Sequence, residues 1–178
     1  YYTPKSKEWI YYKKTDVNVF LENGGLITGG AGTGKSFLLN EWKLLVKCRV
    51  CASTHKASKI INGHTIHKVV AIHPIDLVFD YAVVKKLVDD GITHILIDEV
   101  SMIKTAVWCI LLHIKYKYGF KFICFGDFKQ LKPVEEEHID FENLQLIKEL
   151  CNNTRCHLTE VYRFKDNELL QDAYKCSD

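Results

Sequence analysis

The 178-residue sequence lacks long apolar runs, a large excess of charge and linker-like stretches. Its longest apolar runs, such as Ile110-Leu111-Leu112, are far shorter than the roughly 20 residues that span a bilayer, so no membrane segment is predicted. The net charge is only +2, from 24 Lys and Arg against 22 Asp and Glu, which argues against a histone-like or tail-type nucleic-acid binder. The 3 prolines and 10 glycines form no Gly-, Ser- or Pro-rich segment, so no linker is predicted.

The sequence also lacks a signal-peptide pattern and a regular cysteine spacing. Seven cysteines would leave an odd thiol in a secreted protein, so we expect an intracellular, reducing compartment, either the nucleus or the cytoplasm, or a viral replication site if the source is a virus. Cys48 and Cys51 form a C-x-x-C, and Cys151 and Cys156 lie near His157. We interpret these thiols as packing groups, with a redox or zinc role as the alternative.

What the sequence does contain is an alternation of short apolar runs and longer helical patterns, which is typical of an α/β fold with a parallel sheet. Strands are predicted at 26–28, 49–53, 94–98, 121–125 and 156–159, and helices at 35–46, 81–90, 101–116 and 143–150, with a further helix inside 6–22. The acidic stretch at 133–140 is predicted to be a solvated loop. One domain is predicted over 1–163, and the chain is expected to be a fragment because it opens with Tyr1 and stops within a helical pattern.

A phosphate-binding loop is the strongest motif. The pattern G-x-x-x-x-G-K-[ST] is matched by Gly29, Gly30, Ala31, Gly32, Thr33, Gly34, Lys35 and Ser36, between a predicted strand and a predicted helix. The glycines allow backbone N–H groups to face phosphate oxygens, Lys35 is expected to reach the β- and γ-phosphates, and Ser36 is expected to hold Mg²⁺. The motif predicts ATP and Mg²⁺ as ligands; the alternative is a Gly-rich turn before a helix.

Two further polar segments follow predicted strands. Asp98 is expected to hold Mg²⁺ and Glu99 to orient or deprotonate an attacking water, although a helix start capped with Ser101 is the simpler alternative. Gln130, after the strand at 121–125, is expected to contact the γ-phosphate or the attacking water, with a surface turn as the alternative. Together these residues predict ATP hydrolysis.

The same segments in this order resemble the first motor domain of a superfamily 1 DNA helicase of the RecD and Pif-type branch. The resemblance covers nearly the whole chain and implies a RecA-like P-loop NTPase fold and roles in DNA replication and repair. It rests on the phosphate loop and on Ala52-Ser53-Thr54, Gly63-His64-Thr65-Ile66-His67, Ile97-Asp98-Glu99-Val100-Ser101-Met102, Gly126-Asp127-Phe128-Lys129-Gln130-Leu131 and Leu158-Thr159-Glu160-Val161-Tyr162-Arg163.

The resemblance also assigns residues outside the phosphate site. It implies that Thr54, Thr65 and His67 contact single-stranded DNA, and hydroxyl and imidazole groups suit that role. Arg163 matches the family arginine that reaches the γ-phosphate near the second motor domain. A metal site at His64 and His67 is the alternative for that pair, but it would need two more ligands.

The expected activity is ATP-driven translocation along single-stranded DNA, with 5′ to 3′ travel implied by the resemblance. The second motor domain is missing, residues 164–178 are expected to begin the connection to it, and the fragment is expected to be monomeric. The family Gln that reads adenine is replaced here by Ser6-Lys7-Glu8 followed by Trp9, which leaves the base preference open. The alternatives are a nucleotide or nucleoside kinase and a nucleotide-gated clamp or assembly ATPase that binds DNA without moving.

Overall fold

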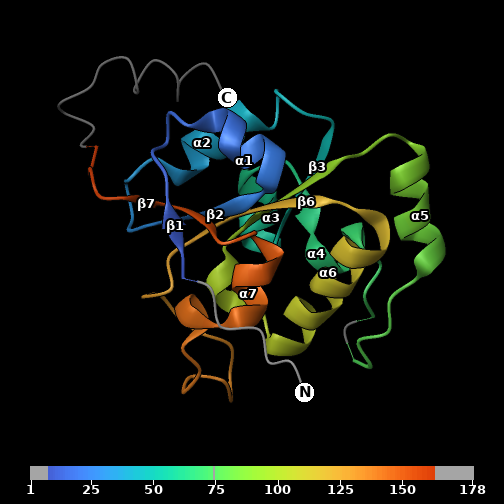
Figure 1. The fold of residues 1–178 in the computed structure, drawn as a ribbon. Coiled ribbons are helices and arrows are strands. Elements are labelled where there is room, and N and C mark those ends of the chain that lie inside the picture. Colours follow the sequence, from blue (N-terminus) through green and yellow to red (C-terminus); the bar gives the residue numbers. More distant parts are fainter. Residues whose placement is uncertain (1–7, 74, 163–178) are drawn as a thin grey trace, which may run out of the picture.

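The computed structural model describes residues 8–73 and 75–162, and at its centre lies a seven-stranded parallel sheet (Figure 1). The strands are β1 (Ile10–Tyr11), β2 (Gly25–Gly29), β3 (Cys48–Ala52), β4 (His64–Thr65), β5 (His94–Asp98), β6 (Lys121–Gly126) and β7 (Thr154–Leu158). They lie in the order β1-β7-β2-β6-β5-β3-β4, and each neighbouring pair is parallel. Their carboxyl ends therefore share one edge, where open α/β sheets bind ligands.

Helices cover both faces of this sheet. The helices are α1 (Val17–Asn23), α2 (Lys35–Trp42), α3 (His55–Ile60), α4 (Ile66–Val69), α5 (Tyr81–Asp89), α6 (Thr105–Tyr118) and α7 (Gln145–Leu150), with 3₁₀ turns η1 (Val100–Met102) and η2 (Phe141–Asn143). Buried side chains of α1, α2 and α3 pack on one face, and those of α4 to α7 pack on the other. The fold is therefore a three-layer α/β domain, which confirms the predicted class of a parallel sheet flanked by helices.

The central strands are apolar because both of their faces are covered. In β2, Leu26 and Ile27 point to opposite faces and are fully buried, and in β6 Phe122 and Ile123 repeat this alternation. Thr28 in β2 and Asp98 at the end of β5 place polar side chains near the carboxyl ends of their strands. The core thus holds the strands rigidly and leaves their polar ends to form a site.

The five predicted strands are confirmed to within two residues at each end. The predictions missed β1 and β4, which are two-residue strands at the sheet edges and are too short to show alternation. The helix predicted at 101–116 is wrong at its start: η1 ends at Met102, and Ile103 and Lys104 take extended backbone angles before α6 begins at Thr105. Ile103 is buried in the core, and this burial takes the chain off the helix axis.

The helix predicted at 35–46 ends earlier, at Trp42. Leu44 and Leu45, which extended the apolar pattern, are largely exposed, so they do not belong to the buried face. The loop at 133–140 has the predicted irregular structure, but it is fixed at one point. One oxygen of Glu136 accepts hydrogen bonds from the Thr105 backbone N–H at 2.8 Å and from the Thr105 hydroxyl at 2.7 Å, at the start of α6.

Within the described residues, the longest helix is α6, and none has the length and apolar content needed to cross a bilayer.

Candidate nucleotide-binding site

The phosphate loop connects the end of β2 to the first turn of α2. Gly32 and Gly34 have φ angles of +76° and +94°, in the region that side chains disfavour, so glycine is required for this turn. The Thr33 hydroxyl donates a 2.7 Å hydrogen bond to the Gly30 carbonyl and holds the loop closed. The loop thus presents its backbone at the N-terminus of α2, as the motif predicts.

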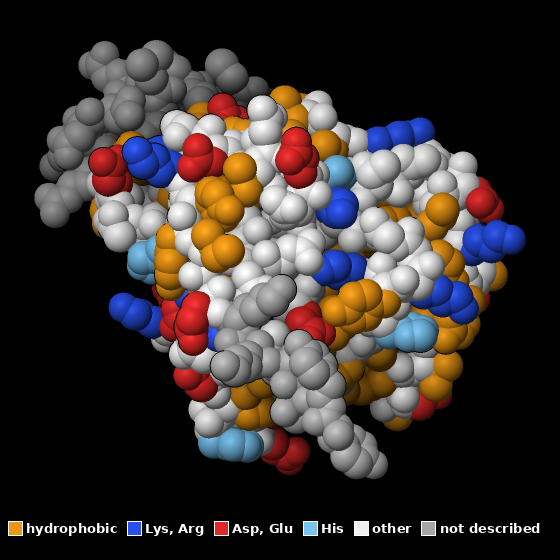
Figure 2. All heavy atoms as spheres, in the orientation of Figure 1, with side chains coloured by type: hydrophobic (Ala, Val, Ile, Leu, Met, Phe, Trp, Pro, Cys, Tyr) orange, Lys and Arg blue, Asp and Glu red, His pale blue; other side chains and the backbone are white. Residues whose placement is uncertain are grey.

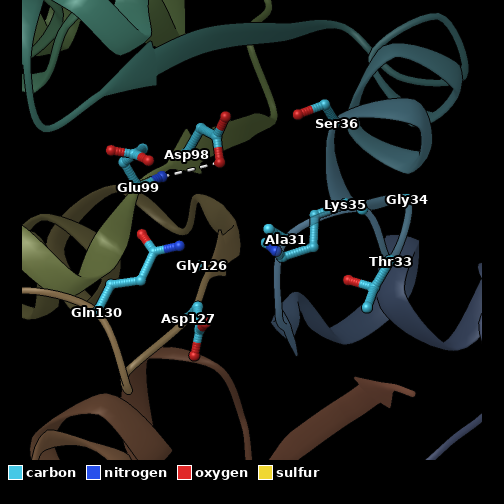
Figure 3. Close-up of a pocket in the computed structure, with 11 residues that line it drawn as sticks. Ala31, Thr33, Gly34, Lys35, Ser36, Asp98, Glu99, Gly126, Asp127 and Gln130 are labelled. Carbon is cyan, nitrogen blue, oxygen red and sulfur yellow. Dashed lines mark hydrogen bonds between the residues drawn. The ribbon is translucent and has the colours of Figure 1, made fainter. Parts of the chain in front are cut away.

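The loop forms one wall of a cavity of about 240 Å³ at the carboxyl edge of the sheet (Figure 3). Residues from three separate segments line it: Ala31, Gly32, Thr33, Gly34, Lys35 and Ser36 from the loop, Asp98 and Glu99 at the end of β5, and Gly126, Asp127 and Gln130 at and after the end of β6. The structure therefore brings the predicted phosphate, metal and water-activating residues around a single space.

Lys35 is held against its own loop. Its Nζ donates to the carbonyl oxygens of Gly29 at 2.6 Å and Gly30 at 2.9 Å. Burial lowers the pKa of Lys35, and the nearby carboxylates of Asp127, Asp98 and Glu99 partly oppose this effect. A phosphate group offers this ammonium a charged acceptor in place of two neutral carbonyls, and charge-assisted hydrogen bonds are stronger.

Asp98 and Ser36 provide oxygen donors on facing walls of the cavity. Burial raises the pKa of the Asp98 carboxyl, whereas the hydrogen bond from the Glu99 backbone N–H, 2.8 Å long, lowers it. Figure 3 shows the Ser36 hydroxyl on the side of α2 that faces Asp98. One carboxylate and one hydroxyl are a donor set that fits Mg²⁺, which takes oxygen ligands and usually keeps several waters.

Glu99 has a strained backbone. It adopts the left-handed conformation, with φ 55° and ψ 45°, which is uncommon for a residue with a side chain. Its N–H donates to Asp98, and its carbonyl accepts a 2.6 Å hydrogen bond from the Ser53 hydroxyl. Both backbone polar groups are therefore tied down. The alternative of a capped helix start does not fit, because η1 has no side-chain cap and Ser101 is buried.

Gln130 and Asp127 approach the cavity from the segment after β6. Gln130 is exposed, and its side chain extends toward the cavity in Figure 3. Asp127 was assigned no role by sequence, although it lines the cavity and its charge acts on Lys35. The same signal that identified Asp98, an acidic residue directly after a buried strand, was present at Asp127.

The predicted DNA-contacting residues lie outside this cavity: Thr54 follows β3, Thr65 is the last residue of β4, and His67 lies in α4. Thr54 and Thr65 cap helices: Thr54 Oγ1 accepts from the Ala57 N–H at 3.2 Å, and Thr65 Oγ1 accepts from the Lys68 N–H at 3.4 Å. His67 is half-buried. Burial is the main cause that lowers its pKa, and the positive charge of Lys104 lowers it further.

Two alternatives for histidine and cysteine can be compared with the geometry. Across residues 8–73 and 75–162, no three His, Cys, Asp or Glu side chains gather as a metal-binding group. Cys48 and Cys51 pack in the cores on opposite faces of the sheet, as expected for residues three positions apart in a strand. This agrees with their interpretation as packing thiols.

The last described residues lie against the phosphate loop. The Tyr162 N–H donates a 2.9 Å hydrogen bond to the Gly32 carbonyl, and the Tyr162 hydroxyl accepts one of 2.5 Å from Lys14 Nζ. This bond to Tyr162 is the main reason that the pKa of Lys14 is raised. The predicted Arg163 and the predicted connection at 164–178 lie outside the described residues.

On the face of the molecule shown in Figure 2, side chains of both signs are present, with most Lys and Arg in the right half of the view and most Asp and Glu in the left half.

Three comparisons with known proteins agree with this geometry. Residues 17–177 match the family model of an AAA domain. The chain is 33% identical over 141 residues to the ATP-dependent DNA helicase Pif1 of Psychrobacter sp. (strain PRwf-1), an alignment covering 68% of this chain and 20% of that protein.

Two solved structures share the fold. The crystal structure of Pif1 helicase from Candida albicans has a TM-score of 0.65 and 24% identity, and the match covers 93% of this chain and 43% of that one. Bacteroides Pif1 bound to ssDNA has a TM-score of 0.63 and 22% identity over 92% of this chain and 45% of that one. The chain thus spans less than half the length of these relatives. By its match over residues 17–177, the chain belongs to the AAA domain family.

Proposed function

We propose that this chain is the ATP-hydrolysing motor domain of a DNA helicase that moves along single-stranded DNA. The observation that carries the proposal is the convergence of Lys35, Glu99 and Gln130 on one cavity, each from a different segment at the carboxyl edge of the sheet. A phosphate loop alone would support nucleotide binding. A carboxylate and an amide facing the same space also provide for the attack of water.

In this proposal the loop binds the phosphates of ATP through its N–H groups and through Lys35. Ser36 and Asp98 hold Mg²⁺, which neutralises phosphate charge when bound. The two oxygen donors suit this ion because they are hard ligands and because they leave room for water and phosphate oxygens. Lys35 exchanges its contacts with Gly29 and Gly30 for the β- and γ-phosphates.

Glu99 acts as the general base that takes a proton from the attacking water. Its fixed backbone, held by Ser53 and Asp98, limits the positions that its carboxylate can reach. Gln130 contacts the γ-phosphate or the attacking water and so distinguishes ATP from ADP. In this way the segment after β6 responds to the state of the nucleotide.

The hydrogen bond from Ser53 to Glu99 provides a physical route from nucleotide to DNA. Ser53 follows β3, and the next residue, Thr54, starts the segment that we propose contacts single-stranded DNA together with Thr65 and His67. A change in the backbone at Glu99 on hydrolysis reaches Thr54 through a single hydrogen bond and one peptide unit. The relative from Bacteroides, whose structure contains ssDNA, supports DNA as the partner.

We further propose that a second motor domain in the parent protein completes the site and that travel is 5′ to 3′. The chain covers 43% and 45% of the two solved relatives, which leaves room for such a domain. In the sequence, Arg163 is the residue after Tyr162, whose N–H donates to the Gly32 carbonyl of the phosphate loop. Its permanently charged guanidinium stabilises the negative charge that develops on the transferred phosphoryl group.

The test is the ATPase activity of the parent protein with both motor domains, with and without single-stranded DNA. We expect strong stimulation by DNA, its loss in Lys35→Ala, and no change in the control Lys85→Ala, which removes an exposed lysine of α5. Streptavidin on one end of the DNA tests direction, since a 5′ to 3′ motor displaces it from the 3′ end. ATP hydrolysis that is indifferent to DNA would favour the clamp or assembly ATPase.

A further inference from the structure

Arg155 of β7 is a charged side chain buried beside the strand that leads into the phosphate loop. It is 3% exposed, and its Nε and Nη2 groups donate to Thr28 Oγ1 at 3.2 and 3.0 Å. Nη2 also donates to the Glu142 carboxylate, and the guanidinium lies 5.7 Å from the ring centre of Trp9 and 5.4 Å from that of Tyr11. A buried charge is costly unless it is fully paired, and this set of partners fixes its position.

The hydrogen bonds of the Thr28 hydroxyl can be fully assigned. The hydroxyl oxygen accepts two bonds from Arg155, which occupies both of its lone pairs. Donation of its own hydrogen to His157 Nδ1, 2.8 Å away, completes this pattern, with Nδ1 as the acceptor. Arg155, Thr28 and His157 thus form an ordered chain of donors and acceptors across β2 and β7.

This chain of hydrogen bonds lies next to the start of the phosphate loop. Thr28 is the residue before Gly29, and it pairs with His157 in the register of β2 and β7. Strand β7 also limits the loop further along: a Cβ atom on Gly29 would lie 2.9 Å from the Leu158 carbonyl oxygen. The direction of the loop N–H groups therefore depends on how β2 is seated against β7.

We propose that Arg155 and His157 are positioning residues that set the phosphate loop for ATP through the hydroxyl of Thr28. The inference rests on the proposed function, because it assumes that the loop binds nucleotide phosphates. Without the hydroxyl, two buried donors and one acceptor lose their partner, and the start of the loop shifts to let other groups satisfy them. A shifted loop presents its N–H groups at the wrong angle and binds phosphate less tightly.

The test compares Thr28→Val with Thr28→Ser in the parent protein with both motor domains. Valine keeps the shape and removes the hydroxyl, whereas serine keeps it. We expect Thr28→Val to raise the KM for ATP and the Kd for ADP about tenfold, with kcat within about twofold, and Thr28→Ser to restore both constants. His157→Ala should act in the same direction, and His157→Asn, whose Oδ1 replaces Nδ1 as acceptor, should restore binding.

A purely structural role would give a different result. Thr154→Val is the matched control, because Thr154 has a buried hydroxyl at the start of β7 that donates to the Asn152 carbonyl, away from the loop. It should lower the melting temperature and leave the KM unchanged. An unchanged KM and Kd in Thr28→Val, or failure of serine to restore them, would overturn the inference. A wild-type protein that neither binds nor hydrolyses ATP would instead overturn the proposed function.

Discussion

The side chains that line the cavity carry more negative than positive charge, which opposes the binding of phosphates. Lys35 is the cation of the loop itself, and the carboxylates of Asp98, Glu99 and Asp127 act on it from the other walls. The phosphates of ATP add further negative charge to this space. The Mg²⁺ that we propose at Asp98 would offset this repulsion, so tight ATP binding and metal binding are expected to depend on each other.

The role of Glu99 can be separated from nucleotide binding. Glu99→Gln keeps the side-chain shape and the backbone bonds but removes the group that accepts a proton. We expect kcat for ATP hydrolysis to fall about a hundredfold or more while the Kd for ATP changes little. Steady-state ATPase and equilibrium binding measure the two constants. Glu41→Gln, at an exposed position of α2, is the control, and a kcat close to wild type in Glu99→Gln would contradict the assignment.

The buried charge of Asp98, which we expect to bind metal, should lower the free energy of unfolding of the domain. Burial raises its pKa above the ordinary 3.8, so the folded protein holds this proton more tightly than the unfolded chain. The free energy of unfolding therefore decreases as pH rises from 3.8 through the raised pKa, and the full penalty is present at neutral pH. Asp98→Asn carries no charge and avoids this penalty.

Without nucleotide, Asp98→Asn should unfold at a higher temperature than wild type at pH 7, and the difference should shrink toward zero as the pH falls below 3.8. Mg²⁺ with ATP should stabilise the wild type and leave the variant nearly unchanged. Thermal unfolding across pH, with and without Mg²⁺ and ATP, measures both effects. Asp89→Asn, on the exposed side of α5, should show neither, and a pH-independent difference for Asp98→Asn would refute the argument.

At the scale of elements, the loop after β6 is held in place by a helix that lies outside the cavity. Glu136 accepts two hydrogen bonds from Thr105 at the start of α6 and places a negative charge at the positive end of that helix. The loop that begins with Asp127 and Gln130 is thereby anchored at its far end. Movement of Gln130 with the nucleotide state is therefore confined to the segment between β6 and Glu136.

Glu136→Ala should destabilise the domain by about 1 kcal/mol, because the Thr105 N–H and hydroxyl lose their acceptor. Chemical denaturation measures the change. Glu137→Ala, at the exposed neighbouring position, is the matched control and should be close to neutral. Equal effects of the two substitutions would show that the hydrogen bonds from Thr105 do not stabilise the start of α6.

The elements that could be predicted from sequence are those whose pattern is local. The strands β2, β5 and β6 are continuous apolar runs, and the phosphate loop and Asp98 follow them directly. The interruption at Ile103 and Lys104 could not be predicted, because the helical periodicity continues through it and only the burial of Ile103 decides it. The hydrogen bonds between Arg155 and Thr28 could not be predicted from the sequence either, since 127 positions separate the two residues in the chain.

At the scale of the whole molecule, the nucleotide cavity and the proposed DNA segment lie on the same edge of one sheet. The strand order places β6 and β5 between β2, which ends at the phosphate loop, and β3, which leads to Thr54. These strands are buried on both faces, so nucleotide state is expected to reach DNA through the loops at their ends. The Ser53 to Glu99 hydrogen bond joins two of those loops.

Residues 1–178 alone should hydrolyse ATP slowly, because in the proposed function a second motor domain of the parent protein completes the site. We expect kcat to be about a hundredfold or more below that of the parent protein with both motor domains, since charge stabilisation supplied from a second domain, of the kind that an arginine provides, is worth about a thousandfold or more. Cooperative thermal unfolding of residues 1–178 is the control for folding. Equal kcat values for the two proteins would place the complete catalytic site within this domain.

The parallel sheet has a practical consequence at its opposite edge, where the amino ends of the strands lie. The turn between α6 and β6 belongs to this edge, and a Cβ atom on Gly119 would meet no other atom within 4 Å. The φ of +77° there is kept if a short flexible insertion follows the glycine rather than replacing it. A fluorescent dye or a surface tether attached at this turn would sit across the sheet from the nucleotide and DNA, where it could report stepping of single molecules without obstructing either ligand.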